Sequence, residues 1–253
     1  MVTNTMFLFL SAACAKATRA DIVFLVDESG SVGQDNFPKI QKFLRIFIEG
    51  LDIGSDKVRV GLAQYSDEMH QEFLLKDYTD KRSLLEQVNR RQVRGGGTST
   101  GQAMAFLQSR YFTKEAGSRA DEGVAQVVVL ITDGPSEDDV VGPSLALRNQ
   151  GVIMFAIGVG DYYDEDQLKS IVSQPHEQFL IKVDSYQNLQ GVKDSLLHTV
   201  CSSVTEPVST PVPDPYLPGK LLSPPGRDNY VFASCLSVCL RVVCEQPISY
   251  RCL

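Results

Sequence analysis

Short apolar runs alternate with amphipathic stretches along most of the chain. Three of these runs, at residues 22–26, 127–131 and 153–157, are continuous and rich in β-branched residues. Such runs are typical of strands that are buried on both faces. A hairpin is predicted where a short polar break separates two weaker strand patterns. The full set of predicted strands is 22–26, 58–65, 69–75, 127–131, 153–157 and 179–183.

Helical patterns fill the gaps between these strands. The clearest has apolar residues at positions 37, 40, 43, 44, 47 and 48, and shorter patterns follow residues 80, 100, 164 and 188. Strands that alternate with helices imply βαβ units, and therefore a doubly wound α/β fold. We expect a mainly parallel sheet of about six strands with helices on both faces. The strand from Asp21 should be central and beside the strand from Val127, and residues 69–75 should form an antiparallel edge strand.

Composition supports one globular domain with flanking segments. The chain has 253 residues, of which 43% are hydrophobic and 22% are charged. We interpret residues 1–20 as a possible signal peptide and N-terminal lead, and residues 21–201 as the domain. Residues 202–229 are rich in proline and resemble a linker, and residues 230–253 form a cysteine-rich tail that is too small for a core without crosslinks. No window approaches 18 uncharged apolar residues, so we expect no membrane span.

Charge and cysteine usage narrow the choice of partners. The net charge is -7, which argues against a nucleic-acid binder and is compatible with binding to cations or to basic protein surfaces. Cys14 and Cys201 flank the domain, and we predict a disulfide between them in an oxidising compartment. Signal cleavage after Ala13 would keep Cys14, whereas cleavage after Ala15 would remove it.

Three loops carry candidate chemistry at the carboxyl ends of predicted strands, where open parallel sheets bind ligands. They contain Asp27-Glu28-Ser29-Gly30-Ser31, residues 95–101 and Thr132-Asp133-Gly134. Two carboxylates and several hydroxyls form an all-oxygen set that suits Mg²⁺, Ca²⁺ or Mn²⁺. Taken singly, each motif is explained equally well by a helix cap, a common turn or a flexible glycine loop. Together, at these strand ends, they reinforce one another.

The motif set makes the sequence similar to a von Willebrand factor type A domain. The matching segments are the opening strand with D-x-S-x-S at 21–31, the threonine loop at 96–101, the aspartate strand at 128–134 and the next strand at 152–160. The resemblance covers about residues 21–200 and is nearest in character to the A domains of collagen type VI long chains and related matrix proteins.

This resemblance implies a metal-ion-dependent adhesion site. Ser29, Ser31 and Thr98 would contact the ion, and Asp27 and Asp133 would do so directly or through water. Mg²⁺ is the expected ion, with Mn²⁺ or Ca²⁺ as alternatives, and one position would remain open for an acidic side chain of a partner. Glu28 departs from the small residue that many members carry, and we expect it to face solvent.

The resemblance further implies a secreted adhesion or structural module of the extracellular matrix. Its partners would be collagens or other matrix and cell-surface proteins. We expect no enzyme, because Ser29 lacks a Gly-x-Ser-x-Gly context and the three histidines, at 70, 176 and 198, fit surface or packing positions. Two alternatives stay open: an intracellular domain of this family that scaffolds an assembly, and a matrix module whose metal site is not used for binding.

Two Arg-Ala-Asp sequences, at 19–21 and 119–121, are not integrin-binding Arg-Gly-Asp motifs. We expect both to be ordinary surface.

Overall fold

The structure, a computed structural model, describes residues 19–205 of the chain. The possible signal peptide, most of the predicted proline-rich linker, the cysteine-rich tail and Cys14 lie outside this range, so the predictions made for them remain predictions. Among the helices of residues 19–205, none is long and apolar enough to cross a membrane.

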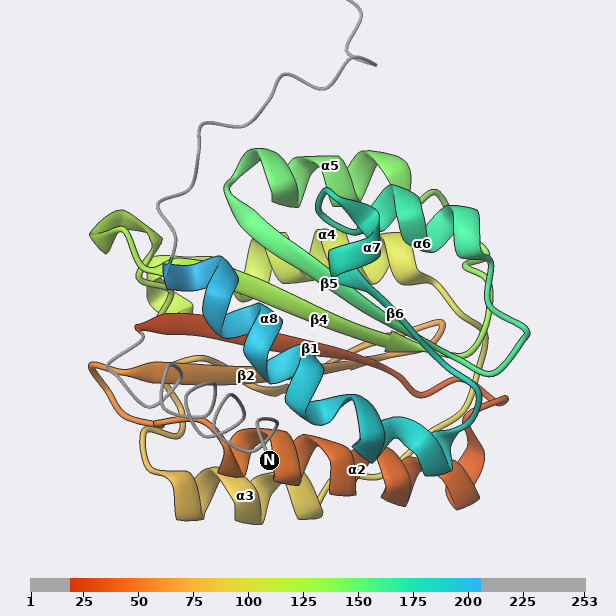
Figure 1. Cartoon of the computed structure of the whole chain (residues 1–253), viewed down its shortest axis with the longest axis horizontal. Helices are drawn as coiled ribbons and strands as arrows, with labels where there is room; N and C mark the ends of the chain where they lie inside the picture. The colour runs from red at the N-terminus through yellow and green to blue at the C-terminus, as the bar shows by residue number, and fades with distance from the viewer. Residues whose placement is uncertain (1–18, 206–253) are drawn as a thin grey trace, which may run out of the picture. The chain divides into compact units, whose positions relative to one another are not determined.

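The centre of the fold is a six-stranded sheet in the order β3-β2-β1-β4-β5-β6 (Figure 1). All neighbouring strands are parallel except β2 and β3, which form an antiparallel hairpin at one edge. The predicted doubly wound sheet is therefore confirmed, including the central β1 beside β4. The strands are β1 (Ala20–Asp27), β2 (Val58–Tyr65), β3 (Met69–Phe73), β4 (Ala125–Thr132), β5 (Val152–Val159) and β6 (Leu180–Val183).

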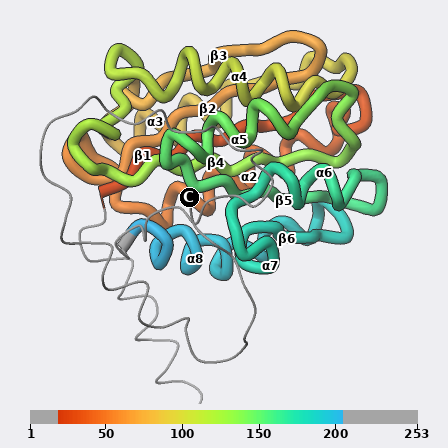
Figure 2. The backbone as a smooth tube through the Cα atoms, turned by 90° about the horizontal axis from the view of Figure 1, so that it is seen from above, coloured from red at the N-terminus to blue at the C-terminus, as the bar shows by residue number. Residues whose placement is uncertain are grey.

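Helices cover both faces of the sheet (Figures 1 and 2). One face carries α2 (Gly33–Glu49), α3 (Lys81–Asn89) and α8 (Lys193–Thr205). The other carries α4 (Thr100–Arg110), α5 (Val141–Asn149) and α6 (Glu165–Ile171), while the short α7 (His176–Phe179) precedes β6. The sequence pattern did not predict α5, whose buried residues are only Ser144 and Leu147. The last predicted helix is divided in the structure into the 3₁₀-helix η3 (Tyr186–Val192) and α8.

The core forms where α2 packs on the sheet. All six apolar residues that predicted this helix are buried, because their 3.6-residue spacing places them on one face. The ring of Phe47 on α2 meets the ring of Phe24 on β1 edge to face, with 5.5 Å between centroids. This packing fixes β1, the strand that carries the D-x-S-x-S motif, in the middle of the molecule.

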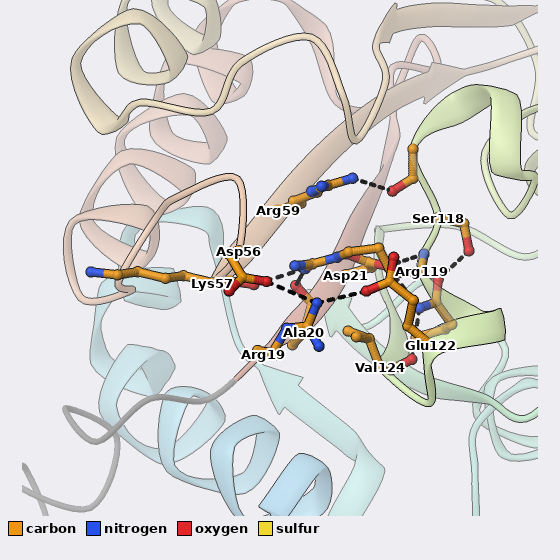
Figure 3. A network of polar contacts seen from close by, with 12 residues as sticks. Arg19, Ala20, Asp21, Asp56, Lys57, Arg59, Ser118, Arg119, Glu122 and Val124 are labelled. Atoms are coloured by element: carbon orange, nitrogen blue, oxygen red, sulfur yellow. Dashed lines mark hydrogen bonds and ion pairs between the residues drawn. The ribbon is translucent and has the colours of Figure 1, made fainter.

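The two Arg-Ala-Asp sequences meet at the end of the sheet where β1 begins (Figure 3). Arg119 donates to Asp21 through its peptide nitrogen at 2.7 Å, through Nε at 2.9 Å and through Nη2 at 2.6 Å. Both side chains are buried, with 3% and 0% of their surface exposed. The expectation of ordinary surface is therefore wrong for Asp21 and Arg119, which form an internal ion pair across 98 residues of sequence.

Exposed charges surround this pair. Arg19 contacts Glu122 at 2.7 Å and Asp56 at 2.9 Å, all three side chains being at least 41% exposed. Arg119 Nη2, which is buried beneath these exposed charges, also donates to the carbonyl oxygens of Lys57, at 2.7 Å, and Ala20, at 3.1 Å. The guanidinium thus joins the start of β1 to the loop that precedes β2.

Candidate metal site at the carboxyl edge of the sheet

The strand register brings the predicted site together at the opposite edge. Asp27 pairs with Tyr65 on β2, and Val26 pairs with Ile131 on β4, so that Asp27 and Thr132 end at the same level. Thr132 Oγ1 donates to Asp27 Oδ2 at 2.7 Å, and the Ser29 peptide nitrogen donates to Asp27 Oδ1 at 2.8 Å. These bonds hold the fully buried Asp27 carboxylate at the base of the site.

The hydroxyl groups lie above this carboxylate and reach the second aspartate. Ser29 Oγ and Ser31 Oγ are 3.0 Å apart, and Ser31 Oγ donates to Asp133 Oδ1 at 2.6 Å. Thr98 is buried and lies beside the loop that carries Asp133. A Cβ atom added at Gly134, the next residue of that loop, would be 3.9 Å from Thr98 Oγ1. The structure therefore gathers all five predicted residues: Asp27, Ser29, Ser31, Thr98 and Asp133.

The triple glycine is required by this arrangement. Gly30 N donates to Gly96 O at 2.9 Å, and Gly95 N donates to Glu28 O at 3.0 Å, so the two loops are joined by their backbones. Gly95 and Gly96 have φ values of 85° and 117°, which favour glycine. A Cβ atom at Gly96 would also lie 2.8 Å from Asp67 Oδ2. The loop that carries Thr98 is thus fixed against the D-x-S-x-S loop.

The start of α4 ties the threonine loop to the aspartate loop. Asp138 accepts hydrogen bonds from Gly101 N at 2.8 Å and from Gln102 N at 2.7 Å, which satisfies amides at the helix N-terminus. Ser136 Oγ accepts from Thr100 N at 3.1 Å. Gly101 permits this contact, since a Cβ there would lie 1.9 Å from Asp139 O. The sequence reading did not identify Asp138, whose role depends on a contact across 37 residues.

The electrostatics of the site favour a cation. Burial raises the pKa of the Asp27 carboxyl to about 6, against the opposing effect of hydrogen bonds from Ser29 and Thr132. The Asp133 carboxylate raises this pKa as well. Within residues 19–205, no lysine, arginine or histidine forms an ion pair with either aspartate.

The donor set fits a hard divalent ion. In the described part of the chain, no group of three or more His, Cys, Asp and Glu residues is arranged to hold a metal. The oxygen donors here are instead two carboxylates and three hydroxyls, which match the preference of Mg²⁺ and Mn²⁺ for oxygen and leave room for water. Sulfur and nitrogen donors, which zinc often takes in structural sites, are absent from this group of five.

Glu28 does not face solvent, and the expectation that it would is wrong. Its side chain is 0% exposed and lies 2.6 Å from His70 Nδ1 and 3.1 Å from Arg94 Nη1. Gln64 Nε2 donates to it at 2.9 Å, and the Arg94 peptide nitrogen at 3.2 Å. Burial raises the pKa of Glu28, whereas Arg94 and His70 oppose that shift. Glu28 therefore anchors the back of the D-x-S-x-S loop.

A further ion pair extends this anchor. Arg94 Nη2 lies 2.8 Å from Glu72 Oε1, and Arg91 Nη1 lies 2.5 Å from Glu72 Oε2. Glu72 is on β3, so the edge hairpin supports the loop that carries Asp27. The alternation of residues along β3 gives no signal for this role, because the partners are arginines 19 and 22 residues later.

Two tyrosines near the site were also not identified from sequence. Tyr65 Oη and Thr100 Oγ1 are 3.0 Å apart, and burial holds the pKa of Tyr65 well above its usual range. Tyr186, at the start of η3, is buried close to Asp133. Neither lies in a motif, and only their position in space relates them to the site.

Comparison with known proteins agrees with the geometry. Collagen alpha-4(VI) chain of Mus musculus is 42% identical over 194 residues, which are 77% of this chain and 8% of that protein. Matrilin-2 of Mus musculus is 33% identical over 194 residues, 76% of this chain and 20% of that protein. The chain thus spans less than a quarter of the length of these relatives.

Solved structures show the same fold. Proximal thread matrix protein 1 from the mussel byssus, with a zinc-occupied MIDAS motif, aligns with a TM-score of 0.66 and 25% identity. The alignment covers 73% of this chain and 46% of that one. Manganese-loaded TRAP protein of Plasmodium vivax aligns with a TM-score of 0.57 over 70% of this chain and 73% of that one, at 23% identity, and shows the fold alone.

The von Willebrand factor type A domain model matches residues 21–195. That segment runs from the second residue of β1 to the first part of α8 and includes all five residues of the candidate site. The chain belongs to the von Willebrand factor type A domain family.

Proposed function

We propose that this chain is an adhesion module of the extracellular matrix that binds a protein ligand through a divalent ion. The ion would be held by Asp27, Ser29, Ser31, Thr98 and Asp133. One observation carries the proposal: two carboxylates without a cationic partner among residues 19–205 meet three hydroxyls at the carboxyl ends of β1 and β4. The similarity to collagen chains and to matrilin-2 supports a matrix setting.

The five residues of the site would supply two kinds of oxygen ligand. Asp27 and Asp133 supply negative charge, and Ser29, Ser31 and Thr98 supply neutral oxygens, so that the two carboxylates balance a divalent ion without excess charge. When bound, the ion supplies a position that accepts a carboxylate oxygen from a partner. We favour Mg²⁺, which takes six oxygens in an octahedron and retains water readily, with Mn²⁺ or Ca²⁺ as alternatives.

The partner would be a matrix or cell-surface protein that presents an aspartate or glutamate. The site lies at the edge of the sheet, where the loops between strands and helices converge, and therefore on the surface of the domain. We propose no catalysis there, because no histidine or thiol lies among the five residues to act as a base or a nucleophile.

Binding to immobilised collagens and other purified matrix proteins, in Mg²⁺ or in a chelator, tests this function. We expect binding in Mg²⁺ only. Asp133→Ala should reduce it to the level seen in chelator, because an anionic ligand is lost, and Thr98→Ala should weaken it less, because the lost ligand is neutral. Asp121→Ala, at an exposed position on the 3₁₀-helix η2 (Ala120–Glu122), is the matched control and should bind normally.

Two results would contradict the proposal. Binding that is equally strong in chelator and in Asp133→Ala would support a matrix module that uses another surface. Fractionation that places the full protein inside cells would support the intracellular scaffold instead.

A further inference from the structure

The hydroxyl of Tyr186 is buried without a partner. The side chain is 6% exposed, and its oxygen has no hydrogen-bond partner in the part of the chain that the structure describes. Tyr65 and Tyr111, which are fully buried, both have partners, namely Thr100 Oγ1 and the carbonyl oxygen of Leu62. Because a buried hydroxyl that has lost water without a replacement is unfavourable, the exception at Tyr186 requires an explanation.

The strand register places this hydroxyl at the same edge of the sheet as the metal site. Thr132 at the end of β4 pairs with Gly158 on β5, Gly158 pairs with Lys182 on β6, and Tyr186 follows β6 by three residues. Burial and the Asp133 carboxylate hold the pKa of Tyr186 above its usual range, and Asp27 adds to the effect. Asp133 Oδ1 accepts from Ser31, whereas Asp133 Oδ2 accepts from no donor among residues 19–205. A buried hydroxyl without a partner thus lies at the same edge of the sheet as a half-buried carboxylate oxygen that can accept from it.

We propose that Tyr186 is a positioning residue of the metal site, whose hydroxyl, unpartnered without metal, donates to the Asp133 carboxylate when the ion is bound and holds that carboxylate toward it. The inference rests on the metal site of the proposed function. Carboxylates that bind metals are commonly held by hydrogen bonds from residues outside the coordination shell, and loss of such a partner typically lowers metal affinity 10- to 100-fold. Residue 186 begins η3, so a 3₁₀-helix after the edge strand would help to orient a ligand in the loop that follows β4.

Tyr186→Phe tests the inference, because it removes the hydroxyl and keeps the ring. Titration calorimetry with Mn²⁺ should give an affinity roughly tenfold weaker than that of the unaltered protein. Thermal unfolding in chelator should give an unchanged or higher melting temperature, because an unsatisfied buried group is gone. A purely structural role predicts the reverse: a lower melting temperature with an unchanged Mn²⁺ affinity.

Tyr111→Phe is the matched control. Tyr111 caps the end of α4 that is remote from Thr98, and its hydroxyl donates to the carbonyl of Leu62. This variant should have a lower melting temperature and an unchanged Mn²⁺ affinity.

The outcomes separate this inference from the proposed function. If the unaltered protein binds Mn²⁺ and Tyr186→Phe binds it equally well, the role of Tyr186 is overturned and the proposed function stands. If the unaltered protein binds no Mn²⁺ or Mg²⁺, the metal-dependent function itself is overturned, and the role of Tyr186 with it.

Discussion

Asp21 and Asp27 lie at opposite ends of β1, and both are fully buried. Asp21 accepts hydrogen bonds from Arg119 and from Gln126 Nε2, the latter at 2.8 Å, so that its charge is neutralised inside the protein. Among residues 19–205, Asp27 accepts from the Ser29 amide and the Thr132 hydroxyl and forms no ion pair.

The two ends of β1 therefore differ in the source of the positive charge that neutralises the buried carboxylate. A buried carboxylate is stable only when it is paired or bound to a cation, or when it takes up a proton. The protein itself provides the cation at Asp21. At Asp27 and Asp133 it provides hydroxyl groups and an open edge of the sheet, which suits a cation from solution.

Removal of the Arg119 guanidinium, the internal cation that pairs with Asp21, should have the largest effect on stability. Arg119→Ala leaves Asp21 buried and unpaired, and it also removes the donor to the carbonyl oxygens of Lys57 and Ala20. We expect a loss of about 5 kcal/mol in the free energy of unfolding, measured by urea denaturation. Arg19→Ala, whose ion pairs are exposed, should cost far less. Equal losses for the two variants would show that the buried pair has no special role.

Neutralising each aspartate in turn sharpens the comparison. Asp21→Asn leaves the Arg119 guanidinium buried without a counter-charge, which should cost about 3 kcal/mol. Asp27→Asn removes a charge that has no cationic partner within the described residues, and should change stability in chelator by no more than about 1 kcal/mol. Denaturation of both proteins without metal measures the difference. A larger loss for Asp27→Asn would contradict the account.

Glu28 provides an intermediate case, since it is buried beside Asp27 but has partners. Glu28→Ala removes the acceptor of the Gln64 amide and of the Arg94 peptide N–H. We expect a loss of about 2 kcal/mol in the free energy of unfolding. Glu68→Ala, an exposed residue 3.8 Å from His70, should have an effect below about 0.5 kcal/mol. If the two variants were equally stable, Glu28 would not anchor its loop.

An exposed carboxylate should show the smallest effect. Hydrogen bonds from Lys182 and then Lys169 lower the pKa of Glu165 to about 2. Because this pKa is lower in the folded protein, the contacts of Glu165 with the two lysines stabilise the folded state at neutral pH. This contribution is lost as the pH falls from 4.5 to about 2.

Denaturation between pH 2 and 5, compared for the unaltered protein and Glu165→Gln, measures this loss. The variant should show a slightly flatter dependence of stability on pH, whereas Glu177→Gln, at an exposed position on α7, should not. A steeper dependence of stability on pH in Glu165→Gln would contradict the stabilising contribution assigned to Glu165 at neutral pH.

The fold was predictable because periodicity is a local property. The spacing of apolar residues in α2 and the continuous runs of β1, β4 and β5 are visible within short windows, as are the three loop motifs. The α5 helix was not predicted because it buries one small polar residue and one leucine. The assignment of ligands relied on the family resemblance, since each motif alone also fits a turn or a cap.

The errors concern residues whose environment depends on distant partners. Glu28 meets Arg94 across 66 residues, and Asp21 meets Arg119 across 98. A charged residue read alone is expected to be exposed, because most are. The sheet order places the start of β1 beside the start of β4, which Arg119 precedes, and so brings Asp21 and Arg119 together. Arg94 instead reaches Glu28 from the loop between α3 and α4, which is joined to the end of β1 by its backbone.

The most direct test of the central claim is calorimetric titration of Mg²⁺ and Mn²⁺ into protein that has been freed of metal with a chelator. The account predicts one ion per chain, no binding by Asp27→Asn, and normal binding by Asp121→Ala. Absence of binding in the unaltered protein, or unchanged binding in Asp27→Asn, would contradict the claim that a cation from solution binds the carboxylates at this end of β1.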